Sequence, residues 1–355
     1  MSLDEADADG DGDHACTDCD DGDPAVESFD LDGDFFSTCD GDCDDSHPAI
    51  NPYASDYVGD GVDQNCDGID NDCDPVTDEE GDVDADGFSL CDGDCDDGDA
   101  ATSPAAYDVC DGLDNDCNGA ADDLCVDCGI WVPFDEPSIA SAVAGAIDGD
   151  VICVAPDTHP GSVDFSGKAI HLLGVGGPAV TILDGNGTST VVRLESGEGP
   201  DSVLQGFTLT NGNAVEGGGV SIRTGSPTLD DLVIEDCSST YGGGLFLEST
   251  AATITNTWIT GNAGLYFGGG LYASGGSPQL DNVVIHGNNG YSGGGISVAN
   301  SGTVTVTNSI VLGNEATTGS GGGVYMSYGT LEMENVVISG NTSGGYYGGG
   351  LSLSY

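Results

Sequence analysis

The chain has 355 residues, of which 63 are acidic and three are basic, and its formal net charge is −60. A charge of this sign repels phosphate backbones and anionic lipid surfaces, so it excludes electrostatic binding to nucleic acid or to a membrane and favours cations as partners. The charge is unevenly placed, since 43 of the acidic residues and 12 of the 14 cysteines precede Gly129. We therefore expect two domains, residues 1–128 and residues 129–355.

No stretch of the chain approaches the roughly 18 continuous apolar residues of a membrane span. The first ten residues, MSLDEADADG, have neither the basic nor the apolar region of a signal peptide. We expect no membrane insertion in this segment and place any signal sequence outside this chain. Twelve cysteines in 128 residues resemble a disulfide framework, which persists in oxidising compartments, so the expected location is extracellular or at the cell surface.

The first domain repeats one pattern of aspartates and cysteines. In three copies, beginning at Asp7, Asp30 and Asp82, three alternate aspartates precede a cysteine pair by the same interval. The second and third copies superpose at an offset of 52 residues through CDGDCDD, and then at 51 where GVDQNCDG matches GLDNDCNG. An acidic segment with few apolar residues is otherwise typical of disorder, but a disordered tail has no reason to keep this spacing. We expect an irregular but folded repeat segment.

The alternating aspartates predict sites for a hard cation. Carboxylates at positions 1, 3 and 5 of a loop converge on calcium, which takes about six to eight oxygen ligands. The turn glycine of position 6 is present as Gly12 and Gly87, but copy two has Phe35 there, and no copy has the glutamate that EF-hands use at position 12. We expect CDGDCDD, backbone carbonyls and water to complete the shell. The candidate metal ligands are Asp7, Asp9, Asp11, Asp18, Asp30, Asp32, Asp34, Asp40, Asp42, Asp44, Asp82, Asp84, Asp86, Asp92, Asp94, Asp96, Asp111, Asp114 and Asp116.

Several calcium ions are therefore the expected cofactors. Carboxylates about 4 Å apart repel one another by several kcal/mol, and bound divalent ions turn that repulsion into attraction, so we expect calcium binding and folding to be coupled. Two alternatives stay open. The cysteines, as thiolates, would suit zinc or cuprous copper, and the segment could be a solvated acidic spacer.

This pattern resembles the MopE-type metal-binding motif repeats of secreted and surface proteins. The resemblance covers residues 4–124 and rests on DxDxDG, CDGDCDD, a spacer with proline, and CDGLDNDCNG. It implies metal binding. The chain departs from the pattern in its first copy, which lacks the CDGxDNDC half, and in its second, where Gly59 stands at the position of Cys110.

The second domain carries a GGG triplet followed by an alternating apolar strand every 25 to 28 residues, which indicates a solenoid. Asparagines recur in two columns in phase with the triplets, and columns of asparagine can hydrogen-bond along a stack of strands about 4.8 Å apart. The columns are Asn256, Asn282, Asn308 and Asn335, and Asn262, Asn288, Asn314 and Asn341. The expected fold class is mostly β, a single-stranded right-handed parallel β-helix preceded by the irregular, Asp/Cys-rich calcium-loop segment.

The start of this domain predicts a cap for the solenoid. Residues 137–147 have the pattern of a short amphipathic helix with Pro137 at its first position, and GDVICVAP is the expected first strand. We expect the cap to span about residues 129–160 and the GGG coils residues 217–355. Because natural solenoids avoid an uncapped end, we expect the chain to be part of a longer protein.

This domain resembles the pectin-lyase-like β-helix superfamily, and its GGG and GN repeats are similar to those of polymorphic outer-membrane and surface proteins. The resemblance covers residues 129–355 and implies the fold but not an activity. Enzymes of the superfamily use a basic residue beside calcium or clustered aspartates. Here the three basic residues, Lys168, Arg193 and Arg223, all precede the best-formed repeats, and the sequence alone indicates no cluster of acidic residues.

The second residue after each triplet is expected to face away from the core, which gives the column Ser221, Phe246, Tyr272, Ser297, Tyr325 and Ser352. Exposed aromatic rings in a line could stack on sugars. An aromatic ladder that covers neighbouring coils or docks another chain is the interpretation that we favour. Cys153 and Cys237 lie far apart in the sequence, and two buried free thiols explain them as well as a disulfide does.

Together these patterns predict a secreted or surface-attached, calcium-binding structural or adhesion protein with no catalytic activity of its own. Its expected partners are divalent cations, with a polysaccharide or another surface protein as candidates for the solenoid. The alternative is a polysaccharide lyase or glycoside hydrolase with a calcium-binding accessory segment, and three carboxylates converging in a groove along the solenoid would favour it. Copper handling by free thiols is a third hypothesis.

Overall fold

A computed structural model describes residues 32–34, 36–44, 46–52, 54, 64, 66, 82–109, 113–119, 121, 127–345 and 347–354. The chain divides into two compact units. The first comprises Met1–Val83 and Phe88–Asp97, and the second comprises Asp84–Gly87 and Gly98–Tyr355. The end of the acidic segment, from Gly98 onward, therefore belongs to the same unit as the solenoid.

The first unit contains two short 3-10 helices, η1 (Thr38–Asp40) and η2 (Leu90–Asp92), and no strand in its described residues. Both helices arise from the same sequence, S-x-C-D-G. In each, the aspartate accepts hydrogen bonds from the preceding serine, and the glycine that follows adopts a left-handed backbone, with φ of 95° at Gly41 and 99° at Gly93. The predicted repeat of copies two and three is thus a repeat of structure.

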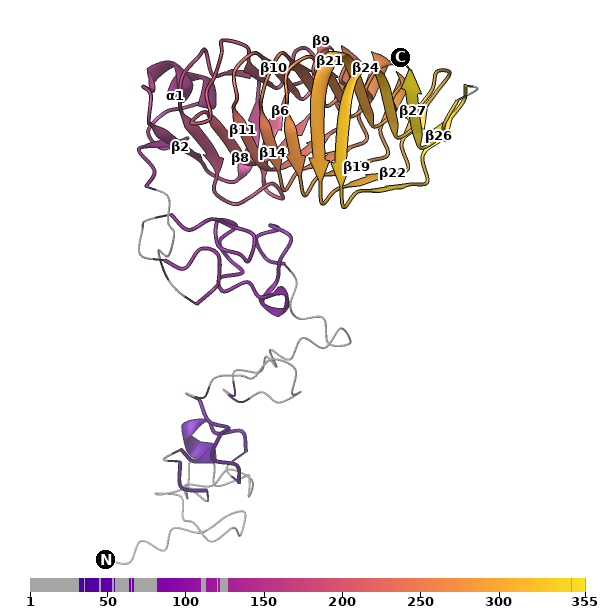
Figure 1. Ribbon diagram of the computed structural model, residues 1–355. Coiled ribbons are helices and arrows are strands. Elements are labelled where there is room, and N and C mark those ends of the chain that lie inside the picture. Colours follow the sequence, from indigo (N-terminus) through magenta and orange to yellow (C-terminus); the bar gives the residue numbers. More distant parts are fainter. Residues whose placement is uncertain are drawn as a thin grey trace, which may run out of the picture. The chain divides into compact units, whose positions relative to one another are not determined.

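A right-handed parallel β-helix forms the second unit from Ile130 onward, which confirms the predicted fold (Figure 1). The N-terminal end of the solenoid is capped by α1 (Ile139–Gly145), whose buried side chains Ile139, Ala142 and Val143 belong to the solenoid core. The helix begins two residues later than predicted, because the Ser138 hydroxyl accepts a hydrogen bond from the Ser141 amide and so takes the cap position after Pro137. A strand, β1 (Ile130–Val132), precedes the predicted first strand, β2 (Val151–Val154).

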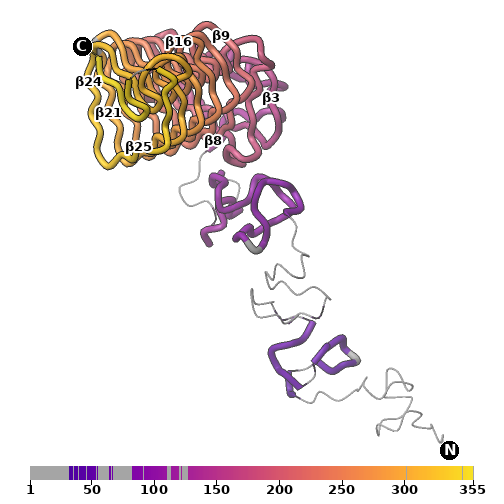
Figure 2. The backbone as a smooth tube through the Cα atoms, turned by 90° about the vertical axis from the view of Figure 1, so that its right-hand side faces the viewer, coloured from indigo at the N-terminus to yellow at the C-terminus, as the bar shows by residue number. Residues whose placement is uncertain are grey.

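Every strand pair in the described solenoid is parallel, and the strands of successive coils lie in register along the stack (Figure 2). The early coils contain β3 (Asp157–Pro160), β4 (Val163–Asp164), β5 (His171–Gly174) and β6 (Thr181–Asp184). The strands that follow the triplets are β10 (Val220–Arg223), β13 (Leu245–Glu248), β17 (Leu271–Ser274), β21 (Ile296–Thr307), β24 (Val324–Glu334) and β27 (Leu351–Ser354). They are in line with β7 (Val192–Leu194) of an earlier coil.

Two further sets of strands complete the coils. One set continues the same large sheet and comprises β8 (Val203–Thr210), β11 (Thr228–Glu235), β14 (Thr253–Thr255), β15 (Trp258–Thr260), β18 (Gln279–Asp281), β19 (Val284–His286), β22 (Ile310–Leu312) and β25 (Val337–Ser339). The other forms a separate six-stranded sheet of β9 (Asn213–Glu216), β12 (Ser238–Tyr241), β16 (Ala263–Phe267), β20 (Asn289–Ser292), β23 (Glu315–Ala316) and β26 (Thr342–Ser343). No helix in the described part of the chain is long and apolar enough to cross a membrane.

The triplets make the corner between the six-stranded sheet and the next coil face. The first glycine needs a left-handed backbone, with φ of 64° at Gly242. The second lies so close to the neighbouring coil that a Cβ on Gly243 would be 2.3 Å from the Gly269 carbonyl oxygen. Only glycine satisfies both requirements, which explains why the triplet recurs once per coil.

The two asparagine columns have different structural roles. Asn262, Asn288 and Asn314 are fully buried, and each side chain donates to the amide oxygen of the next asparagine and to a backbone carbonyl. The other column lies at exposed turns with a left-handed backbone, φ 48° at Asn256, where asparagine is tolerated better than other residues. Both columns are therefore structural, as the sequence predicted.

The buried column generates a stability prediction. Replacing Asn288 by Ala would remove the acceptor of the Asn262 backbone and side-chain N–H groups and the donor to the Ile259 carbonyl. Because these groups would stay buried without partners, we expect a loss of about 3 kcal/mol in the free energy of unfolding. Urea unfolding followed by circular dichroism measures it. Asn335→Gly, which removes one exposed link of the other column, should cost about 1 kcal/mol or less, and equal costs would contradict the assigned roles.

Candidate functional site

The first candidate metal site gathers three predicted aspartates in copy two. Ligand oxygens of Asp32, Asp34 and Asp42 lie within 4.8 Å of one another. Asp42, from CDGDCDD, is only 3% exposed, and the Asn51 amide donates to Asp34 Oδ2 over 2.8 Å. CDGDCDD thus contributes an oxygen ligand next to the alternating aspartates.

The loop of copy three has the same local geometry. Ligand oxygens of Asp82, Asp84 and Asp86 fall within the same 4.8 Å limit. The Asp86 amide donates to Asp84 Oδ1 over 3.1 Å, the same contact as Asp34 makes to Asp32 in copy two. Asp86 is 2% exposed whereas Asp82 is exposed, so the loop holds one carboxylate of the group away from bulk water.

The third group lies in the second unit and contains a residue that sequence reasoning missed. Asp108 joins the predicted Asp114 and Asp116, again within 4.8 Å, and is 5% exposed. Its Oδ1 atom accepts hydrogen bonds from the backbone N–H groups of Asn115 and Asp116. Comparing the copies could not reveal Asp108, because Tyr57 stands at the equivalent position of copy two.

Other predicted ligands lie elsewhere. Asp40 and Asp92 accept hydrogen bonds from Ser37 and Ser89 at the two 3-10 helices. Asp44 is fully exposed, and its pKa is lowered by hydrogen bonds from Ser46. Asp94 is buried, and its Oδ1 atom accepts from the Asp96 amide. None of these residues belongs to a described group of three, whereas Asp7, Asp9, Asp11, Asp18, Asp30 and Asp111 lie outside the described residues.

The donor set of all three groups is carboxylate oxygen. Cys43 is bonded to Cys66 with a Cα–Cα distance of 5.6 Å, and Cys95 and Cys117, at the corresponding positions of copy three, are both disulfide-bonded. These four cysteines therefore offer no thiolate to a metal. In copy two, the Cys43–Cys66 disulfide ties CDGDCDD to the second half of the motif.

The cysteines of the solenoid and the one that joins it to the acidic segment are also poor metal ligands. Cys153 is bonded to Cys128, which joins the end of the acidic segment to β2, so the interpretation of Cys153 as a free thiol is wrong. Cys237 is a buried free thiol, and burial raises its pKa to about 12. A thiol this hard to ionise is a weak ligand at neutral pH.

On the solenoid, three carboxylates converge on one guanidinium group. Arg223 forms ion pairs with Glu195, Glu216 and Glu248, and the Ser221 hydroxyl donates to Glu195 Oε1 over 2.5 Å. The residues come from adjacent coils and from two sheets. The carboxylates are thus compensated by the cation that gathers them.

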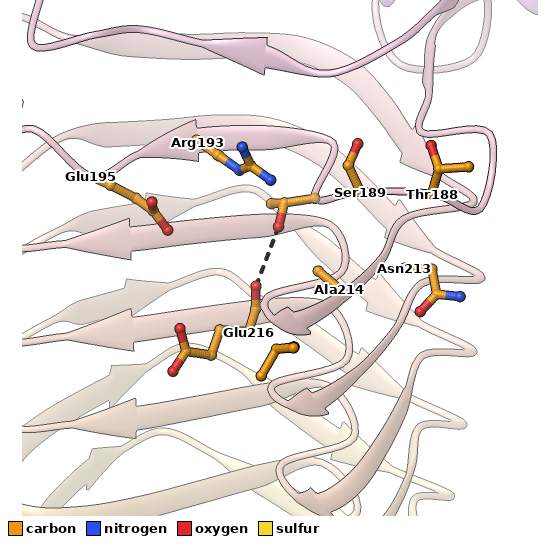
Figure 3. Close-up of a pocket in the computed structure, with 9 residues that line it drawn as sticks. Thr188, Ser189, Arg193, Glu195, Asn213, Ala214 and Glu216 are labelled. Atoms are coloured by element: carbon orange, nitrogen blue, oxygen red, sulfur yellow. Dashed lines mark hydrogen bonds between the residues drawn. The ribbon is translucent and has the colours of Figure 1, made fainter.

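A pocket of about 320 Å³ lies beside this cluster (Figure 3). Arg193, Glu195 and Glu216 line it together with hydroxyl and amide side chains at its other side. The Thr190 hydroxyl donates to the Glu216 backbone carbonyl over 3.3 Å and fixes one wall. The pocket offers both charges and several hydrogen-bonding groups, which suits a polar ligand.

The column expected to face outward is partly covered. Ser221, Phe246 and Ser297 are at most 3% exposed, because rings from the neighbouring six-stranded sheet lie against this column. Phe246 stacks on Tyr272 with ring centroids 5.7 Å apart, and Tyr241 packs against Tyr272 at 5.5 Å. The aromatic residues thus form a ladder that covers neighbouring coils, and this part of it presents no continuous exposed line of rings.

A buried polar contact joins the end of the acidic segment to the solenoid within the second unit. The Tyr107 hydroxyl donates to Asp231 Oδ2 over 2.7 Å, and the Tyr107 amide donates to the Val175 carbonyl. Burial raises the pKa of Asp231, which the bond from Tyr107 partly counteracts. His171, bonded to Gln205, has its pKa lowered by burial.

Comparison with known proteins identifies both parts of the chain. The Cu-binding MopE family model, a metal-binding motif, matches residues 18–29, 42–69, 66–79 and 94–123. The family model of the right-handed β-helix region matches residues 170–354. No curated protein matches the chain. A solved structure, pectin methylesterase from carrot, is similar over 65% of this chain and 89% of its own, with 12% identity and a TM-score of 0.36.

The Tyr107–Asp231 contact generates a pH-dependent prediction. An aspartate whose pKa is raised on folding costs stability once it is ionised, so the cost is present above the folded pKa and absent below the usual value near about 4. Tyr107→Phe removes the bond that lowers the pKa, so we expect a loss of about 1–3 kcal/mol at pH 7 that shrinks as the pH falls through the raised folded pKa toward about 4. Thermal unfolding at several pH values measures it. Tyr347→Phe, at an exposed position, should change nothing, and a Tyr107→Phe cost independent of pH would contradict the coupling.

Proposed function

We propose that this chain, which belongs to the right-handed β-helix family, is a non-catalytic extracellular or cell-surface protein whose acidic repeats bind several calcium ions. The solenoid would serve as a stalk or adhesion surface. One observation carries the proposal. Three groups of aspartates bring their oxygens within 4.8 Å in a segment of 128 residues that contains no lysine or arginine.

Electrostatics supports a cation from solution. One aspartate of each group, Asp42, Asp86 or Asp108, is at most 5% exposed, and buried carboxylates in proteins are paired with charges or coordinate metals. With no basic side chain in this segment, a solution cation is the natural counter-charge. Bound ions of charge +2 would also stabilise the folded segment by mass action.

The donor chemistry favours calcium. Carboxylate, carbonyl and water oxygens suit calcium, whereas zinc and cuprous copper prefer thiolate or imidazole, and Cys43, Cys66, Cys95 and Cys117 are in disulfides. Left-handed glycines, with φ of 89° at Gly33 and 102° at Gly87, let the short loops turn around an ion. Disulfides in an acidic repeat segment also favour an oxidising, extracellular location.

Calorimetry on the full chain after chelation tests this function. We expect calcium to bind at no fewer than three sites, one per described group, more tightly than zinc or copper(II) at the same ionic strength. Asp108→Asn should weaken one site by about tenfold or more, because it removes a buried charged ligand. Asp127→Asn removes the same charge at an exposed position and should leave all sites unchanged. Equal effects of the two substitutions would mean general charge attraction, and no calcium binding would refute the function.

A carbohydrate-active enzyme is the second candidate, and the convergence of Glu195, Glu216 and Glu248 beside the 320 Å³ pocket favours it. Paired carboxylates perform acid–base chemistry on glycosidic bonds. Against an enzyme, all three carboxylates share one guanidinium group, that of Arg223, as their ion-pair partner. We expect no release of reducing sugar from neutral or acidic polysaccharides. Release that Glu216→Gln abolishes and that the exposed substitution Glu332→Gln preserves would establish the enzyme instead.

A further inference from the structure

A smaller pocket, of about 260 Å³, lies in the second unit between residues of the last acidic repeat and the first coils of the solenoid. Tyr107, Trp131 and Phe134 contribute its aromatic walls, and Val175 is among its apolar lining residues. Its volume lies just below the range of about 300–1,000 Å³ for pockets of drug-sized ligands. It could therefore enclose a small head group.

Two of the aromatic rings meet nearly at right angles. The centroids of Trp131 and Phe134 are 6.2 Å apart, and their planes are inclined by 71°. The Phe134 side chain is 77% exposed, so most of its surface is left to solvent at the pocket. An exposed aromatic ring at the mouth of a pocket is free to pack against the apolar part of a ligand.

The ring arrangement is held by the backbone. Trp131 lies on β1 in register with Cys153 of β2. The disulfide between Cys153 and Cys128 fixes the residues just before β1. Asp135 closes the turn, because its side chain accepts from the Trp131 amide and its own amide donates to the Trp131 carbonyl. A rigid pair of rings lowers the entropic cost of binding.

The charge around the pocket is negative. Asp99 lines it, no lysine or arginine does, and the chain carries a net charge of −60. Aromatic faces add the negative side of their quadrupoles. Few polar groups are left for a sugar, since the Tyr107 hydroxyl is bonded to Asp231 and the Asn115 carbonyl oxygen accepts from Val109.

We propose that this pocket binds a small organic cation through a quaternary ammonium group. Such a group has apolar methyls that fit an aromatic and aliphatic wall, and a positive charge that the rings and Asp99 attract. A hydrated metal ion lacks the apolar surface, and a phosphate-bearing head group would be repelled by the acidic surroundings. The ligand class is therefore a net-positive trimethylammonium compound.

Tryptophan fluorescence can locate the binding event. The chain has two tryptophans, so Trp258→Phe leaves Trp131 as the single reporter. In buffer with calcium, we titrate this variant of the full chain with choline, with its uncharged isostere 3,3-dimethylbutan-1-ol, and with phosphocholine. We expect saturable quenching by choline, with about tenfold weaker binding of the neutral isostere, and weaker binding of phosphocholine. Phe134→Leu should weaken choline binding about fivefold or more, whereas Tyr291→Leu, an exposed aromatic elsewhere, should not.

Four results would overturn the proposal. Equal affinity for choline and its neutral isostere would show an apolar site, and phosphocholine binding as tightly as choline would remove the charge argument. Quenching that Phe134→Leu leaves unchanged, or no quenching at all, would exclude this pocket. Because the pocket and the proposed calcium sites use different readouts, failure here leaves the calcium titration intact.

Discussion

Repulsion between carboxylates is the constraint on which the acidic half of the molecule depends. The segment before Gly129 has 43 acidic residues and no basic one, yet Asp42 and Asp108 are buried. Disulfides and backbone hydrogen bonds fix the loops, but neither supplies positive charge. Folding brings the carboxylates of these loops close together, so cations bound between them would contribute to the free energy of folding of this segment.

In the solenoid the constraint is the burial of polar backbone groups rather than the repulsion of charges. Three successive coils are closed by glycine corners and by a fully buried asparagine, Asn262, Asn288 or Asn314, whose side-chain amide donates to two neighbouring groups. Stacking repeats this solution, so each coil depends on the next. The single irregularity in the buried column is informative. Cys237 occupies the position of the first asparagine, and its backbone amide donates to Asn262 Oδ1. Because a cysteine side chain has no amide group, the hydrogen-bonded column of asparagine side chains begins at Asn262.

The sequence predicted features that recur, and it failed where a single residue or a three-dimensional neighbour decides. Triplet and asparagine spacing predicted the β-helix, and the alternating aspartates predicted groups such as Asp32 and Asp34. Asp108 was missed because copy two has no acid at its position. The convergence on Arg223 was missed because Glu216 comes from a different sheet from Glu195 and Glu248, and periodicity in one strand column says nothing of the adjacent one.

Within the second unit, three consecutive residues of the last acidic repeat link the third aspartate group to the solenoid. Tyr107 bonds Asp231, Val109 packs with Leu173 and Val175 of the solenoid, and Asp108 between them belongs to the third aspartate group. The Asn115 side-chain oxygen accepts from the Val109 backbone amide, and the Asn115 backbone amide donates to Asp108 Oδ1, so the loop and the packed residues form one hydrogen-bonded unit. An ion bound at this loop would therefore also order the residues that pack on the solenoid. Asp108 cannot move without Tyr107 and Val109, because the three residues are consecutive along the backbone. An interaction that stabilises the aspartate group would therefore also stabilise the contacts of Tyr107 and Val109 with the solenoid.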